Sequence, residues 1–312
     1  MRIWIANTDS DWYSFLRARP DLDEVNFWQP STPKNFGVIS PGSPFLFRLK
    51  SPVKKIGGFG FFATASKLPA SLAWETFGEM NGAPTFERML ALIRAYRKGP
   101  EDSRDDPVIG CRIVGDVVFF PESHWVDQPA DWRRPIVQGK RYDTTSGEGR
   151  RVWTECLARA ADLRSDWVND PALKEIYEGA RFGRPVPVQR RLGQGSFKVA
   201  VLDAYGRACA VTTEHSLPVL EAAHIKPYAD GGLHDYGNGI LLRSDVHRLF
   251  DKGYMSIDPN YRIHVSRRLR EEWKNGMTYY PFEGREIEKP EDESRWPDRN
   301  LLEWHYDEVF RR

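Results

Sequence analysis

Four polar side chains in the last third of the chain have the types and spacing of a small metal-dependent site: His224, Asn238, His247 and Asp251. His247 and Asp251 are four residues apart, so in a helix their side chains lie on one face. An imidazole nitrogen and a carboxylate oxygen are ligands that hard and borderline divalent cations accept. The pattern therefore indicates one cation held between His247 and Asp251, opposite the imidazole of His224.

The local sequence also predicts the elements that must position these side chains. The loop that leads into the second strand of this region carries Asn238, and the first strand ends at about His224. Ser244 or Asp245 can cap the helix that follows, and Gly253 can end it. We expect a helix, two strands and a second helix at residues 197–205, 219–225, 239–242 and 246–252, respectively.

This region resembles the HNH nuclease family, which has the ββα-metal fold. The separations of fourteen residues from His224 to Asn238 and nine from Asn238 to His247 match the family pattern. An upstream Arg-Leu-Gly-Gln-Gly sequence also resembles the lead-in of HNH modules in restriction enzymes, and the likeness covers roughly residues 191–269. The matching stretches are Ala223-His224-Ile225-Lys226-Pro227, Gly231-Gly232, Asn238-Gly239-Ile240-Leu241-Leu242-Arg243 and His247-Arg248-Leu249-Phe250-Asp251.

The resemblance implies a role for each residue of the set. His224 would be the general base that deprotonates the attacking water, since an unperturbed imidazole has a pKa of about 6.5. Asn238 would brace the loop and orient the His224 ring through a hydrogen bond. His247 would bind the metal, together with Asp251. The cation would be Mg²⁺ or Mn²⁺, with Zn²⁺ or Ni²⁺ as alternatives, and it would stabilise charge on the phosphate.

One position departs from the family pattern. Many members carry Asp or His as a metal ligand immediately before the general base, and this chain has Ala223 there. Three alternatives follow: Glu221 completes the shell, water completes it, or the site binds metal weakly.

Bulk properties place the chain among cytoplasmic globular proteins. Its 312 residues exceed what one core usually holds, so we expect two domains. No apolar run is long enough to cross a bilayer, and the N-terminus lacks a secretory signal, so we expect a cytoplasmic protein with no membrane partner. Net charge is only +1 overall, but residues 181–270 hold 14 Lys/Arg against 8 Asp/Glu. A basic region of this kind is typical of a phosphate-binding module.

The remaining sequence predicts an α+β protein in three parts. Residues 1–145 contain short apolar runs with turn signals, among them Gly57-Gly58, which indicate a mostly β domain. Two helical patterns interrupt this domain at residues 10–17 and 85–97, and Thr85 can cap the second. Residues 146–190 are expected to form a helical linker, with a helix at about 152–168 that Asp170-Pro171 stops or restarts. Residues 191–312 are the expected nuclease domain.

The N-terminal part resembles the PUA-like superfamily, especially its EVE branch, through the order of four stretches. The resemblance implies a β barrel with flanking helices that binds a modified base of DNA or RNA. Trp28 and Trp74 are the expected pocket walls, with Trp12 and Phe36 behind them, although such aromatic residues also commonly form a core. The four stretches are Ile3-Trp4-Ile5-Ala6-Asn7, Phe27-Trp28-Gln29-Pro30, Pro41-Gly42 with Phe45-Leu46-Phe47-Arg48-Leu49, and Ile56-Gly57-Gly58-Phe59-Gly60.

Together the two likenesses predict a modification-dependent restriction endonuclease. It would flip a 5-methyl- or 5-hydroxymethylcytosine out of double-stranded DNA and cut a phosphodiester bond nearby. An RNA-directed HNH nuclease, a modified-nucleic-acid binding protein with weak catalysis, and a nonspecific defence nuclease are the alternatives. A homodimer would supply two active sites for cutting both strands. The apolar C-terminal segment around Leu302 and Phe310 would then contribute to the dimer, or else cover the nuclease core.

Overall fold

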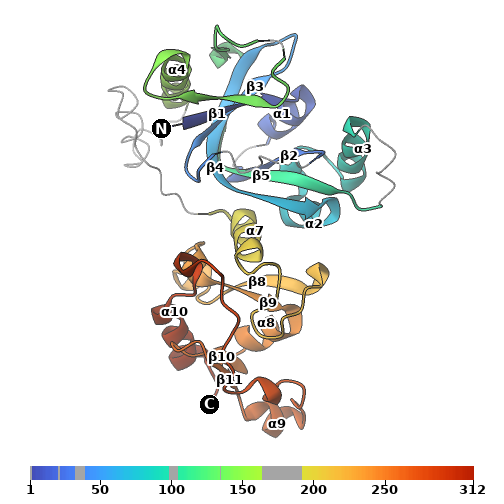
Figure 1. Ribbon diagram of the computed structural model, residues 1–312, viewed down its shortest axis with the longest axis vertical. Coiled ribbons are helices and arrows are strands. Elements are labelled where there is room, and N and C mark those ends of the chain that lie inside the picture. The colour runs from blue at the N-terminus through green and yellow to red at the C-terminus, as the bar shows by residue number, and fades with distance from the viewer. Residues whose placement is uncertain (1, 20–21, 32–38, 98–104, 134, 164–191) are drawn as a thin grey trace. The chain divides into compact units, whose positions relative to one another are not determined.

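The computed structural model describes residues 2–19, 22–31, 39–97, 105–133, 135–163 and 192–312. The chain divides into two compact units, Met1–Arg190 and Arg191–Arg312 (Figure 1). No helix within the described ranges is long and apolar enough to cross a membrane.

The N-terminal unit is built on one seven-stranded sheet. Its strands follow the order β2-β5-β4-β3-β1-β7, and β6 pairs with β4. β1 is parallel to β3, whereas the other pairs are antiparallel. The strands are β1 (Arg2–Thr8), β2 (Glu24–Gln29), β3 (Pro44–Leu49), β4 (Lys55–Pro69), β5 (Val108–Phe119), β6 (Val126–Asp127) and β7 (Gly139–Asp143).

This sheet is open within the described residues, so the expected closed barrel is wrong. The two ends of the strand order, β2 and β7, do not pair with each other. The long strand β4 shifts register against β5 twice, between Phe59 and Phe61 and between Phe62 and Thr64. Such irregularities bend and twist a sheet, and here they curve it without closing it.

Four α-helices accompany the sheet in the described part of this unit, and two of them confirm the sequence prediction. Asp9 caps the first, where its Oδ1 accepts the backbone N–H of Asp11 at 3.0 Å. Thr85 caps the third through a 3.2 Å bond from the backbone N–H of Arg88. The helices are α1 (Ser10–Arg17), α2 (Ala70–Phe77), α3 (Phe86–Tyr96) and α4 (Gly147–Leu163).

The Gly57-Gly58 pair lies inside β4, so the expected turn there is wrong. A Cβ atom on Gly57 would lie 2.6 Å from the ring of Tyr13, and one on Gly58 would lie 2.1 Å from the carbonyl oxygen of Val118. The hydroxyl of Tyr13 lies 2.9 Å from the carbonyl oxygen of Gly57 and 2.6 Å from that of Phe120. Gly57 therefore permits close packing of α1 on the sheet, Gly58 permits close approach of the β5 backbone, and neither reverses the chain.

Helix α4 packs on the sheet of the N-terminal unit. The ring of Trp153, 1% exposed, meets Phe59 edge to face with the ring centroids 5.0 Å apart. Val152, Cys156 and Leu157 are buried in the same cluster. The described part of the expected linker is thus a core element, and the expected stop at Asp170-Pro171 lies outside the described residues.

The C-terminal unit has the expected order of helix, strand, strand and helix. Asp245 does not cap α8, because its carboxylate accepts hydrogen bonds from the guanidinium of Arg243 at 2.6 and 2.8 Å. Arg243 holds the cap position without a side-chain bond, so the expected capping by Ser244 or Asp245 is wrong. The elements are α7 (Gln194–Ala204), β8 (Leu220–His224), β9 (Gly239–Arg243), α8 (Ser244–Asp251), β10 (Met255–Ile257), β11 (Ile263–Val265), α9 (Arg268–Trp273) and α10 (Arg299–Trp304).

The C-terminal segment covers the core of its own unit. Leu302 and His305 are 0% and 2% exposed, and the His305 ring stacks on Phe250 of α8 with centroids 3.7 Å apart. Nε2 of His305 lies 3.2 Å from the carbonyl oxygen of Phe250, which can only accept, so Nε2 carries the hydrogen. Nδ1 then accepts the hydroxyl of Ser256 at 2.9 Å. His305 is therefore held as a neutral ring.

This buried ring predicts a loss of stability in acid. Burial lowers the pKa of His305 to about 4, below its value of about 6.5 in an unfolded chain. The stabilisation is fully present above about pH 6.5 and is lost as the pH falls towards 4. We expect the free energy of unfolding to fall by on the order of 2–3 kcal/mol between pH 7 and 4.5 through His305 alone.

Urea unfolding at both pH values checks this expectation. His305→Asn removes the titrating ring and should reduce the pH dependence by that amount, whereas His215→Ala, at an exposed histidine, should not. An unchanged pH dependence in His305→Asn would show that the pKa of His305 is the same in the folded and the unfolded protein, which contradicts the expectation.

Candidate active site and base pocket

The β8–β9 hairpin and α8 bring the predicted catalytic residues together. His224 is the last residue of β8 and pairs with Gly239, the first residue of β9, which directly follows Asn238. His247 and Asp251 lie one turn apart on α8, with Nε2 and Oδ2 3.3 Å apart. The charges of both residues act on the pKa of His224. His224, His247 and Asp251 therefore occupy one site, with Asn238 beside it in the chain.

His247 is held between two carboxylates. Its Nδ1 lies 2.6 Å from Oε2 of Glu221 on β8, and its Nε2 faces Asp251. Burial lowers the pKa of His247, but the two carboxylates outweigh burial and raise the pKa overall. Glu221 thus binds Nδ1 of His247, whereas Asp251 lies beside Nε2. A carboxylate in this position fixes the ring and its tautomer and leaves Nε2 free for a ligand.

The donor pair on α8 fits a divalent cation. Neighbouring ligands at ~2.1 Å from an octahedral cation lie roughly 3 Å apart, close to the 3.3 Å between Nε2 of His247 and Oδ2 of Asp251. Glu221 is engaged on the far nitrogen, so water or substrate oxygen would fill the other positions, as is usual for Mg²⁺. Within the described residues, no group of three or more His, Cys, Asp or Glu side chains is arranged as a complete cation site.

Asn238 braces the loop between the two strands. Its side chain is fully buried, and Oδ1 accepts the backbone N–H of Lys226 at 2.8 Å. Nδ2 donates to the carbonyl oxygens of Lys226 and Leu233, both at 2.9 Å. Both amide hydrogens are therefore used, and the expected hydrogen bond to the His224 ring is wrong. Gly232 packs against this network, since a Cβ there would lie 1.9 Å from the carbonyl oxygen of Lys226.

The imidazole of His224 is oriented by two other rings. Phe197 of α7 stacks on it with centroids 4.0 Å apart and planes 12° apart. Nε2 of His224 lies 2.9 Å from Nδ1 of His234, a residue outside the catalytic set predicted from the sequence. Burial, then the charges of His234 and His247, lower the pKa of His224 to about 4. At neutral pH the ring is therefore unprotonated, as a general base must be.

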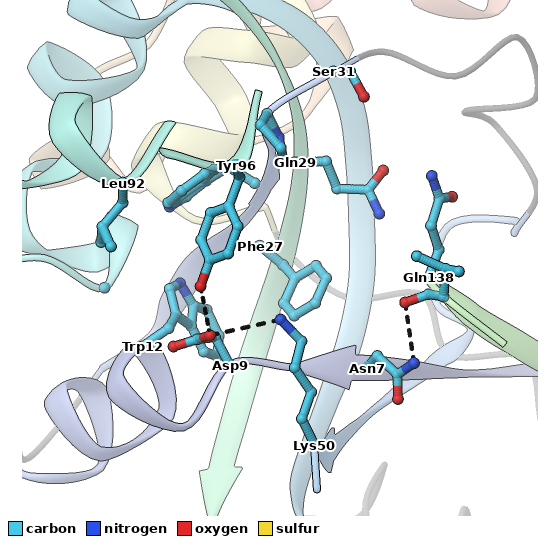
Figure 2. Close-up of a pocket in the computed structure, with 14 residues that line it drawn as sticks. Asn7, Asp9, Trp12, Phe27, Gln29, Ser31, Lys50, Leu92, Tyr96 and Gln138 are labelled. Carbon is cyan, nitrogen blue, oxygen red and sulfur yellow. Dashed lines mark hydrogen bonds and ion pairs between the residues drawn. The ribbon is translucent and has the colours of Figure 1, made fainter. Parts of the chain in front are cut away.

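The N-terminal unit contains a pocket of about 320 Å³ with aromatic walls (Figure 2). This volume is within the ~300–1,000 Å³ of typical small-ligand sites. Trp28, an expected wall, and Trp12, which was expected behind the walls, both line this pocket. Trp74 does not line it and instead contacts Phe86, with centroids 6.3 Å apart. Phe36 lies outside the described residues.

The pocket wall also holds a polar group that the sequence analysis missed. Oδ1 of Asp9 caps α1, and its Oδ2 accepts the hydroxyl of Tyr96 at 2.8 Å and lies 3.5 Å from Nζ of Lys50 (Figure 2). Burial raises the pKa of Asp9, but Tyr96 and Lys50 outweigh it and lower the pKa overall. Burial and Asp9 together raise the pKa of Tyr96 to about 12. At neutral pH the wall therefore presents a carboxylate and a neutral phenol.

Two further polar features adjoin this group. Gln29 is 8% exposed, and its Oε1 has no hydrogen-bond partner among the described residues. The indole N–H of Trp28 donates to the carbonyl oxygen of Asn81 at 2.8 Å, which fixes one aromatic wall. The sequence offered one signal for the polar group at Asp9, the polar cluster Asn7-Thr8-Asp9 at the end of the first strand. Polar residues where a strand passes into a loop commonly serve binding.

Comparison with known proteins identifies one domain. Residues 209–258 match the HNH endonuclease family, and this range contains His224, Asn238, His247 and Asp251. The chain therefore contains an HNH endonuclease domain, and the predicted resemblance is confirmed there. No curated protein matches the chain.

Among solved structures, the chain is similar to the type IV phosphorothioation-dependent restriction endonuclease ScoMcrA. The identity is 13% and the TM-score is 0.19. The likeness covers 74% of this chain and 45% of that one, so this chain spans less than half of its length.

Proposed function

We propose that this protein is a modification-dependent restriction endonuclease that flips a modified cytosine, 5-methyl- or 5-hydroxymethylcytosine, from double-stranded DNA and cuts nearby. The observation that carries the proposal is the presence in one chain of an HNH endonuclease domain and an aromatic pocket of base-binding size. Base contacts specify a site, whereas phosphate contacts only position the protein. A reader pocket would confine an otherwise destructive nuclease to marked DNA.

The chemistry of the pocket supports a flipped cytosine. Stacking on Trp12 or Trp28 would contribute roughly 1–3 kcal/mol per base, against an extrusion cost of a few kcal/mol. The carboxylate of Asp9 is an acceptor suited to the exocyclic amino group of cytosine. The buried, unpartnered Oε1 of Gln29 is a second acceptor that a base N–H would satisfy. Thymine lacks that amino group and would leave Asp9 without a ligand partner.

The HNH domain would carry out the cleavage. His224 would take a proton from the water that attacks phosphorus, and Asn238 would keep the loop after β8 in place. His247 and Asp251 would hold the divalent cation, Mg²⁺ or Mn²⁺ with Zn²⁺ or Ni²⁺ as alternatives, while Glu221 fixes His247 from behind. When bound, the cation supplies stabilisation of the charge that develops on the phosphate and the leaving 3′ oxygen.

The proposed organisation assigns one task to each unit. The N-terminal unit is the PUA/EVE-like reader, with α4 as part of its core, and residues 191–312 are the nuclease.

Double-strand cutting requires either two visits by one active site or two copies of the chain, and we propose a homodimer on DNA. Leu302 is buried within its own unit, so this side chain does not form the dimer contact.

Plasmid cleavage tests the proposal. One plasmid is prepared unmodified, with 5-methylcytosine and with 5-hydroxymethylcytosine, and is incubated with Mg²⁺, Mn²⁺ or EDTA. We expect cutting of modified DNA only, and none in EDTA. Equal cutting of all three forms would contradict the reader assignment, and preferential cutting of matched RNA would favour an RNA-directed enzyme. Selective binding with no cutting under any condition would favour a binding protein.

A matched pair of tryptophan variants locates the reader. Trp28→Ala removes a pocket wall and should abolish the preference for modified DNA, because the flipped base loses its stacking surface. Trp74→Ala removes an aromatic ring of the same unit that does not line the pocket, and it should leave the preference intact. The same loss in both variants would place recognition outside this pocket.

A further inference from the structure

We propose that His234 is a positioning residue of the nuclease site, which accepts a hydrogen bond from Nε2–H of His224 and so keeps Nδ1 of His224 free to act as the base. The inference rests on the nuclease function proposed above. It gives a role to a histidine outside the catalytic set that the sequence predicted.

The local geometry holds the two imidazoles against each other. Nε2 of His224 and Nδ1 of His234 are 2.9 Å apart, and the ring planes are inclined by 67°. Phe197 contacts both rings, at centroid distances of 4.0 Å to His224 and 5.6 Å to His234. Tyr228 stacks on His234 at 5.2 Å with planes 13° apart. An aromatic ring of its own loop thus holds the His234 imidazole in place. Because Tyr228 is 62% exposed, this stacking contact does not serve to fill a core.

Valence limits this contact to two arrangements while both rings are neutral. Each neutral imidazole has one N–H and one acceptor nitrogen. If Nε2–H of His224 donates to His234, then Nδ1 of His224 is an acceptor. If His234 donates instead, the hydrogen of His224 lies on Nδ1, and that ring has no nitrogen left to take a proton. Only the first arrangement permits His224 to act as a base.

The same contact supports the reaction after proton transfer. The water proton moves to Nδ1 of His224 as the water oxygen bonds to phosphorus, and the bond to the 3′ oxygen breaks. The resulting imidazolium keeps Nε2–H donated to the neutral His234, so its charge remains hydrogen-bonded. The proton on Nδ1 then leaves to solvent or to the 3′ oxygen, which restores the starting tautomer. Asn238 does not supply this contact, because its Oδ1, the only acceptor on its side chain, accepts the backbone N–H of Lys226.

Tautomer measurement tests the inference without requiring cleavage. In full-length protein labelled with ¹⁵N-histidine, the His224 signals are assigned by comparison with His224→Ala. We expect His224 to be Nε2–H in the wild type and in His234→Asn, whose Oδ1 replaces the Nδ1 acceptor. We expect a mixture of tautomers in His234→Ala. An Nδ1–H tautomer in the wild type, or an unchanged Nε2–H population in His234→Ala, would overturn the inference whether or not the protein cleaves DNA.

Single-turnover cleavage then measures the effect on rate. Loss of a partner that orients a site residue typically costs about 10- to 100-fold, and we expect this loss in His234→Ala with DNA affinity unchanged. His234→Asn should restore most of the rate, and His215→Ala, at an exposed histidine of the same unit, should not lower it. Full activity of folded His234→Ala would refute the role, whereas failure of the wild type to cut any DNA would refute only the proposed function.

Discussion

Exchange of His224 for alanine is expected to lower the cleavage rate by about 10²- to 10⁴-fold, the usual contribution of a general base. The ring ends β8, stacks on Phe197 and lies in the same site as the donor pair of His247 and Asp251, so its neutral imidazole is placed to act as the base. DNA binding should persist, because the substitution changes neither the pocket nor the Lys and Arg residues of the basic region 181–270. Single-turnover cleavage and a binding assay in EDTA separate the two effects.

The pH profile sharpens this prediction. The pKa of His224 is about 4, so its neutral form predominates throughout the range from pH 6 to 8. Protonation of His224 should therefore reduce the rate only as the pH falls towards 4. His224→Gln, which keeps a polar side chain but cannot act as a base near neutral pH, should be as inactive as His224→Ala. Activity retained in either variant would assign the base elsewhere.

Exchange of Asn238 for alanine is expected to destabilise the C-terminal unit by about 3–5 kcal/mol. The substitution removes the buried amide that bonds the N–H and carbonyl of Lys226 and the carbonyl of Leu233, and all three hydrogen bonds are part-buried. An unsatisfied buried polar group costs about 1–3 kcal/mol, and relaxation of the loop towards water recovers part of the sum. Urea unfolding of the full chain measures the change.

Asn238→Asp is the matched control for this prediction. It has nearly the same shape and keeps the acceptor for the N–H of Lys226, but it replaces the donor with an oxygen that faces two carbonyl oxygens. It should be destabilised at least as strongly as Asn238→Ala. A variant that unfolds like the wild type yet fails to cut DNA would contradict the bracing role and give Asn238 a direct part in the chemistry.

The residues of the nuclease site were predictable because their geometry is mostly local. A helix places His247 and Asp251 together at a spacing of four, and a hairpin brings His224 to Gly239 within one short stretch of chain. The same holds for α1 and α3, whose periodicity and caps lie within each segment. Hydrogen bonding over a few residues sets these features, so the sequence pattern alone determined them.

The contacts that tune the two sites come from residues far apart in the chain, and only the tertiary structure decided them. Asp9, Lys50 and Tyr96 meet because α1, β3 and α3 converge, and no spacing in the sequence encodes that. Tertiary packing also gives residues of the same type different surroundings. Trp28 lines the pocket, whereas Trp74 packs on Phe86. Gly57-Gly58 lies inside a strand, although the sequence predicted a turn, because the two glycines pack closely against elements distant in the chain.

Within the nuclease domain, too, local sequence and tertiary contacts determine different features of the site. The sequence predicted four candidate site residues, and the hairpin and α8 place three of them, His224, His247 and Asp251, close together. The fold decided that Glu221 binds the far nitrogen of His247 and that His234 binds His224. Ring rotamers and loop paths set these contacts, and they depend on how Phe197 and the buried Asn238 fill the space around the hairpin. Close packing in three dimensions, which a linear pattern does not contain, selects one of several local alternatives.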